Sequence, residues 1–214
     1  MAELPSVAWL AEITRFDPPK TIAPPPDWDR AVQVLARHGL APIAAYNLTY
    51  RMPLADTPDA IKDLLLGYMQ GTSGDNVFKF VTLKTAVGDL EDAPMVLLGG
   101  SAFTETLYPH VAFRPVPEIE LLVRQADLSK VIAAFAEERF YEVEMKEPDP
   151  DAPTVHLYND RFFVKLYTNP LPRGDVSGLF QRAQRAKALG ASMLRLSAED
   201  ALVVHALALA RRGF

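Results

Sequence analysis

Residues 96–123 read "VLLGGSAFTETLYPHVAFRPVPEIELLV", and this stretch decides the fold that we expect. It begins with a short apolar run, which is typical of a strand that is buried on both faces. Gly99, Gly100 and Ser101 follow, and the next residues return to helical spacing. The stretch ends in a second apolar strand that contains two glutamates, which a purely structural strand would not need.

The two glutamates are Glu118 and Glu120, which are two positions apart. In a strand their side chains therefore point to the same face. Two carboxylates that close repel each other unless a positive group lies between them. A divalent cation such as Mg²⁺ would supply that charge, because it takes oxygen ligands. The alternative is an edge strand with one wet face, on which two glutamates cost little.

The residues between the first strand and the helix suggest a site for an anion. Glycines such as Gly99 and Gly100 let backbone N–H groups approach a phosphate, and the start of a helix adds a favourable dipole. Ser101 can cap this helix or contact a phosphate. A phosphate-binding turn followed by paired carboxylates is typical of proteins that transfer a nucleotidyl group with metal ions.

The composition limits the class of protein. The chain has 214 residues, a formal net charge of −5 and no cysteine. The acidic balance argues against a broad nucleic-acid surface, which would need a basic patch. The lack of cysteine excludes disulfides, thiolate zinc sites and cysteine nucleophiles. We expect a cytoplasmic protein without membrane anchoring, because no basic leader begins the chain and its most apolar late segment is too short to span a bilayer.

Three regions follow from the patterns along the chain. Residues 1–26 hold many of the 18 prolines and predict an extended arm that includes at most one short helix. Residues 27–92 predict a helical region, in which Gly71 and Gly74 separate two helices. In residues 93–214 strands and helices mix, which predicts an α+β core with a C-terminal helix.

Local signals mark several boundaries within these regions. Asp27 is placed to cap the first helix of the helical region. Asn159 and Asp160 predict the turn of a β-hairpin. Ser197 and Asp200 have the spacing of a capping box, so we expect the last helix to begin at this point.

The central stretch also resembles the bacterial uncharacterised nucleotidyltransferases of the polymerase-beta-like superfamily. Their motif is approximately Leu-Leu-Lys-Gly-Ala-Ala, a helix that ends in Tyr-Pro, then Arg-Pro, and then Asp-Ile-Asp-Leu-Leu-Val. Residues 97–123 align with it without a gap, and the resemblance extends over residues 27–214. It implies a nucleotidyltransferase-like mixed sheet flanked by helices, a nucleoside triphosphate (NTP) as substrate or ligand, and Mg²⁺ as cofactor.

The resemblance also assigns roles to individual residues. The candidate nucleotide-binding group consists of Gly99, Gly100, Ser101 and Arg114, of which Gly100 and Arg114 match the family motif and Gly99 stands where the family has a lysine. The candidate catalytic group consists of Glu118, Glu120 and Lys165, and the two glutamates take the positions of the metal-binding aspartates.

The chain departs from the family at the positions that matter most for chemistry. Glu118 and Glu120 replace aspartates, and the extra methylene moves each carboxylate by about 1.5 Å. Mg²⁺ tolerates little distortion of its octahedral coordination. Lys165 stands where the family has a third acid, and Tyr167 where it has a histidine. A lysine at this position can pair with the glutamates and take the place of the cation.

Three functions therefore remain open. The protein is an active nucleotidyltransferase with a shifted metal site, which transfers a nucleotidyl group to an unknown protein, RNA or small molecule. Alternatively, it is a pseudoenzyme that keeps the fold and binds a nucleotide or a partner. In the third case it is a plain interaction domain, whose surface is the proline-rich arm and the helical region.

Overall fold

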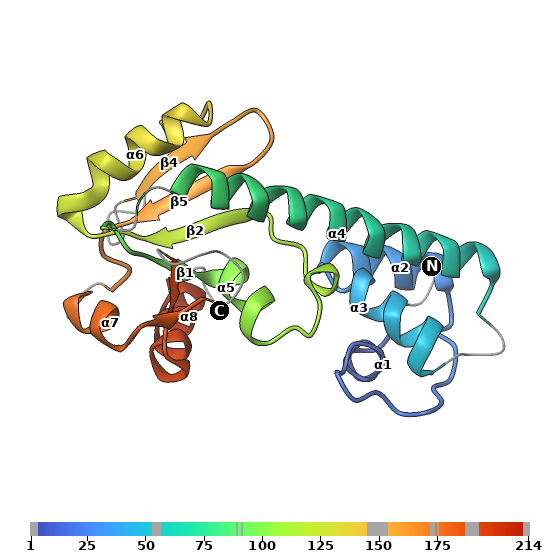
Figure 1. Cartoon of the computed structure of the whole chain (residues 1–214). Coiled ribbons are helices and arrows are strands. Elements are labelled where there is room, and N and C mark those ends of the chain that lie inside the picture. Colours follow the sequence, from blue (N-terminus) through green and yellow to red (C-terminus); the bar gives the residue numbers. More distant parts are fainter. Residues whose placement is uncertain are drawn as a thin grey trace. The chain divides into compact units, whose positions relative to one another are not determined.

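The computed structural model in Figure 1 describes residues 4–52, 57–88, 90, 92–144, 154–171, 174, 176–186 and 193–211. The chain forms two compact units. The first unit comprises Met1–Val77 and Tyr108–Pro115, and the second comprises Phe78–Leu107 and Val116–Phe214. Among the helices of the described residues, none combines the length and the apolar composition that a membrane crossing would require.

The first unit is helical. Its elements are α1 (Val7–Ile13), α2 (Trp28–Arg37), α3 (Ala41–Tyr46), the π-helical segment Asn47–Arg51 and the first part of α4 (Asp59–Val87). The predicted cap is confirmed, because Asp27 Oδ1 accepts a hydrogen bond from Arg30 N at 3.0 Å. The segment 1–26 contains α1, and Ile13 is fully buried in a cluster with Leu35 and Met52.

Helix α4 contradicts the predicted pair of helices. Its 29 residues run without a break through Gly71 and Gly74. A Cβ added at either glycine would meet no described atom within 4 Å, and neither glycine has a positive φ. Each glycine costs the helix up to about 1 kcal/mol relative to alanine. Burial of apolar residues on the other side of the helix, such as Leu65 and Leu83, offsets that cost.

The second unit is built on a mixed sheet, as predicted. Its strands are β1 (Met95–Leu98), β2 (Glu118–Leu122), β3 (Tyr141–Glu142), β4 (Thr154–Tyr158), β5 (Phe163–Tyr167), β6 (Gln184–Arg185) and β7 (Met193–Arg195). Within the described residues the order is β3-β4-β5-β2-β1-β7-β6. The pairs β1–β7 and β2–β5 are parallel, and the other neighbours are antiparallel.

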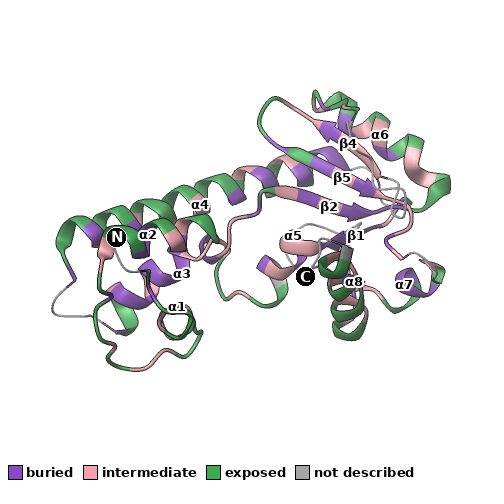
Figure 2. Cartoon of the chain, turned by 180° about the vertical axis from the view of Figure 1, so that it is seen from behind, coloured by how far each residue is buried: buried purple, intermediate pink, exposed green. Residues whose placement is uncertain are grey.

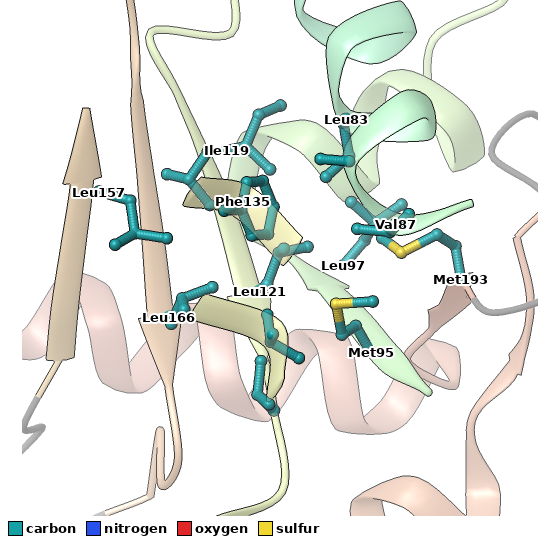
Figure 3. Close-up of a cluster of buried hydrophobic side chains, with 14 of the residues drawn as sticks. Leu83, Val87, Met95, Leu97, Ile119, Leu121, Phe135, Leu157, Leu166 and Met193 are labelled. Atoms are coloured by element: carbon teal, nitrogen blue, oxygen red, sulfur yellow. The ribbon is translucent and has the colours of Figure 1, made fainter. Parts of the chain in front are cut away.

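Helices cover the two faces of this sheet. They are the end of α4, α5 (Gly99–Thr106), α6 (Leu128–Glu137), α7 (Val176–Arg182) and α8 (Ala198–Arg211). On one face Leu83 of α4 and Phe135 of α6 pack with Leu121 of β2, in the cluster that Figure 3 shows. On the other face α7 and α8 pack over β1, where Phe180 and Val204 share a cluster with strand residues. Figure 2 shows the strands as mainly buried or intermediate, and the outer turns of α8 as exposed.

Two local predictions in this unit are confirmed, and two elements were missed. The hairpin β4–β5 turns at Asn159 and Asp160, and Asp160 has a φ of 65°. Asp200 N donates to Ser197 Oγ at 3.2 Å, so Ser197 caps the last helix as predicted. The sequence did not predict α7 or β6, which lie in a segment without clear apolar periodicity.

The continuity of α4 yields a stability prediction. We expect Gly71→Ala to raise the free energy of unfolding by about 0.5–1 kcal/mol, because alanine loses less backbone entropy and fits the open space. Urea denaturation followed by circular dichroism measures this change. A lower stability of the variant would show that the helix does not continue through this glycine.

Candidate functional site

Strand pairing in the second unit brings the predicted acids and the lysine together. Glu120 lies between Leu98 of β1 and Lys165 of β5 in the register of the sheet. Glu118 and Lys165 therefore project from the same face, because residues two apart in a strand share a face. This face adjoins the end of β1, where the chain turns directly into α5 at Gly99.

Lys165 and Glu118 form the ion pair that the sequence suggested. The Lys165 Nζ atom donates to Glu118 Oε1 at 2.7 Å. Their side chains are 21% and 24% exposed, so water screens the pair less than it screens a surface salt bridge. The pair joins two strands whose residues are 47 positions apart. The ammonium thus supplies the positive charge that two neighbouring carboxylates require.

Glu120 lies directly against the glycine turn. A Cβ built on Gly99 would lie 1.6 Å from Glu120 Oε2, so any other residue at this position would displace the carboxylate. Gly99 also has a φ of +54°, which strains other residues. The other carboxylate oxygen, Oε1, accepts a hydrogen bond from Tyr167 Oη at 3.2 Å. The Glu120 carboxylate is therefore in direct contact with the turn at Gly99.

Ser101 stabilises the glycine turn with a buried hydrogen bond. Its side chain is fully buried, and Oγ donates to the carbonyl of Leu98 at 2.7 Å. This bond ties the first turn of α5 to the end of β1. Gly100 is half-buried beside it, in the first turn of the helix. A phosphate contact at these residues stays a prediction.

Arg114 belongs to the first unit. Its Nη1 donates to Tyr108 Oη at 3.3 Å, and its carbonyl accepts from Asn76 Nδ2 at 2.7 Å. Asn76 is fully buried and also donates to the carbonyl of Val111. These bonds hold the segment that carries Arg114, and its proposed contact with a nucleotide stays a prediction.

His156 and Thr154 are polar neighbours that the sequence reading did not assign to the site. His156 lies opposite Lys165 on β4, and its Nε2 is 2.7 Å from Thr154 Oγ1. Burial lowers the pKa of His156, the charge of Lys165 lowers it further, and the charge of Glu118 raises it. Alternation along the predicted hairpin could have placed both residues on the face of Lys165.

With Lys165 bonded to Glu118, the side chains on this face do not fit a resident Mg²⁺. The cation would need several oxygen ligands in octahedral geometry. Lys165 instead brings an ammonium to within 2.7 Å of one of the two carboxylates. In the part of the chain that the structure describes, no three Asp, Glu or His side chains are grouped as a metal site would require.

Comparisons with known proteins give a family and two similar structures. The model of a family described as "Uncharacterised nucleotidyltransferase" matches residues 24–214. A Thermotoga maritima protein assigned as a nucleotidyltransferase is 14% identical with a TM-score of 0.47, and the match covers 63% of this chain and 84% of that one. The antibiotic-resistance factor ANT(2'')-Ia is 11% identical with a TM-score of 0.47, over 64% and 75% of the respective chains. No curated protein matches the sequence.

A double-mutant cycle tests the contact between Glu120 and the turn. In a Glu120→Ala background, Gly99→Ala should lower the free energy of unfolding by about 1–2 kcal/mol, which is the cost of the left-handed backbone alone. In the native background we expect a larger loss, because the carboxylate must also move. Equal losses in both backgrounds would show that the carboxylate does not rest on this glycine.

Proposed function

Since the chain belongs to the uncharacterised nucleotidyltransferase family, we propose that it binds a nucleoside triphosphate at the glycine turn and has lost metal-dependent nucleotidyl transfer. The ion pair between Lys165 and Glu118 is the observation that carries this proposal. It supports a site in which an ammonium takes the place of the divalent cation.

The proposed site uses a small number of groups. Lys165 offers its ammonium to phosphate oxygens, and the backbone N–H groups of Gly99 and Gly100 face the same anion at the start of α5. Ser101 positions this turn through its bond to the strand. In this proposal Lys165 and the glycine turn bind the phosphates of the nucleotide.

The charge balance of the site predicts weak binding. The Lys165 ammonium is already bonded to Glu118, and the Glu120 carboxylate lies against Gly99, in the turn where a phosphate would bind. A polyphosphate therefore meets repulsion from Glu120, while Lys165 must exchange part of its bond with Glu118 for a bond with phosphate. Neutralising Glu120 should consequently strengthen binding that does not depend on a metal.

Metal-dependent transfer of a nucleotidyl group to a protein, RNA or small molecule is the second candidate. The shared face of Glu118 and Glu120 favours it, because paired carboxylates are common ligands of Mg²⁺. The two candidates give opposite expectations for Glu120. Under metal-dependent transfer this carboxylate is required for binding, whereas under the first proposal it opposes binding.

A calorimetric titration with ATP, GTP, CTP and UTP, with and without Mg²⁺, separates the candidates. We expect binding without metal, and Glu120→Gln should raise the affinity about tenfold because it removes one negative charge near the phosphates. Lys165→Ala should weaken the binding by a similar factor. Glutamine preserves an acceptor for the hydrogen bond from Tyr167.

Two outcomes would contradict this proposal. Binding that requires Mg²⁺ and is lost in both Glu118→Ala and Glu120→Gln would establish the metal-dependent alternative. If no nucleotide binds, with or without metal, the result would favour the third function, a plain interaction domain. Binding by each variant is compared with binding by the wild-type chain, and circular dichroism shows that each variant is folded.

A charge reversal provides a second test. Lys165→Glu would place a third carboxylate beside Glu118 and Glu120 on one face. We expect this variant to bind Mn²⁺ at least tenfold more tightly than the wild type, as measured by electron paramagnetic resonance. Lys165→Met is the matched control, because it removes the ammonium without adding a ligand. Equal Mn²⁺ affinity of the two variants would show that Lys165 does not occupy the position of a cation.

A further inference from the structure

Three aromatic side chains form a row on the same face of the sheet as the acids and the lysine. Phe163 of β5 lies opposite Tyr158 of β4, and Tyr158 lies opposite Tyr141 of β3. Directly opposed residues on neighbouring strands point to the same face. We call Tyr141, Tyr158 and Phe163 the aromatic row.

The rings of the aromatic row are ordered by mutual contacts. Tyr158 and Phe163 are stacked, with ring centroids 4.5 Å apart and an interplanar angle of 28°. Tyr141 meets Tyr158 edge to face at 6.0 Å. Tyr141 Oη donates to Asp160 Oδ1 at 2.8 Å, and this bond raises the pKa of Tyr141. The phenol therefore stays protonated and its ring is held in place.

Part of the aromatic row is open to solvent. Tyr141 is 48% exposed and Phe163 is 36% exposed. The helix α6 packs on the opposite face of the sheet, where Phe135 belongs to the core. Two exposed rings next to a third form an aromatic surface, and aromatic faces of this kind accept planar ligands by stacking.

The row begins next to the candidate phosphate site. Phe163 is the register partner of Glu118, and the next row of the sheet holds Glu120, Lys165 and His156. Neighbouring strands are about 4.8 Å apart. Tyr158 therefore lies about 10 Å from β2 along the sheet, and the Lys165 ammonium lies beside the beginning of the row.

We propose that the aromatic row binds the base of the nucleotide whose phosphates are held at Lys165 and the glycine turn. This inference rests on the proposed function, which assigns residues to the phosphates of the nucleotide and none to its base. Stacking does not require a particular base, since every nucleobase has an aromatic face. The net charge of −5 favours a mononucleotide over a nucleic acid.

The structural alternative is that the rings only stabilise the pairing of three strands. Cross-strand aromatic pairs do contribute to sheet stability. In that case their removal would change unfolding and leave the preference for a base unchanged. A ligand with phosphates and no base therefore distinguishes the two roles.

The test compares ATP and CTP with inorganic tripolyphosphate by calorimetry, without metal. We expect each nucleotide to bind at least fivefold more tightly than tripolyphosphate, which is the range of one stacked base. Phe163→Leu and Tyr158→Leu should bring the nucleotide affinity down to that of tripolyphosphate and leave tripolyphosphate binding unchanged. Phe163→Tyr keeps the ring and should keep the preference, and thermal unfolding confirms that each variant is folded.

The outcomes separate this inference from the proposal on which it rests. Equal binding of nucleotide and tripolyphosphate would overturn the role of the aromatic row and leave the phosphate site in place. No binding of either ligand would overturn both. Tighter binding of a single-stranded oligonucleotide than of ATP would assign the row to nucleic acid and contradict a mononucleotide site.

Discussion

The bond between the Lys165 ammonium and the Glu118 carboxylate is the contact on which our proposal for the polar face of the sheet depends. It neutralises one of two acids that would otherwise repel each other, and it occupies space in which a metal ion would need oxygen ligands. The bond exists because β2 and β5 pair in parallel with Glu120 opposite Lys165. Apolar residues on the opposite face, among them Ile119 and Leu166, bury the same strands in the core and so fix this register.

The order of local elements could be predicted from the sequence. The apolar run before Gly99, the Glu-x-Glu strand and the Asn159–Asp160 turn each rely on contacts within a few residues, and the structure has all three. The family also followed from short motifs. Such signals work because strand periodicity and turn chemistry are properties of adjacent residues.

The parts that could not be predicted depend on distant residues. Helix α4 continues through its glycines because packing on its other side outweighs a local preference for a break. The hydrogen bond from Tyr167 to Glu120 joins positions 47 residues apart, and no local signal indicated it. For Lys165 the sequence suggested a glutamate partner but did not show which of the two it contacts. The aromatic row needs the pairing of three strands. No window of sequence shows which strands become neighbours, so these contacts are visible only in the fold.

A crystal structure of the wild-type chain with a non-hydrolysable NTP analogue and Mn²⁺ tests the central claim most directly. Anomalous scattering locates Mn²⁺ independently of the rest of the density. The account predicts Lys165 Nζ within hydrogen-bond distance of a phosphate oxygen, and no manganese between Glu118 and Glu120. Manganese bound to both carboxylates, with Lys165 turned away from them, would contradict it.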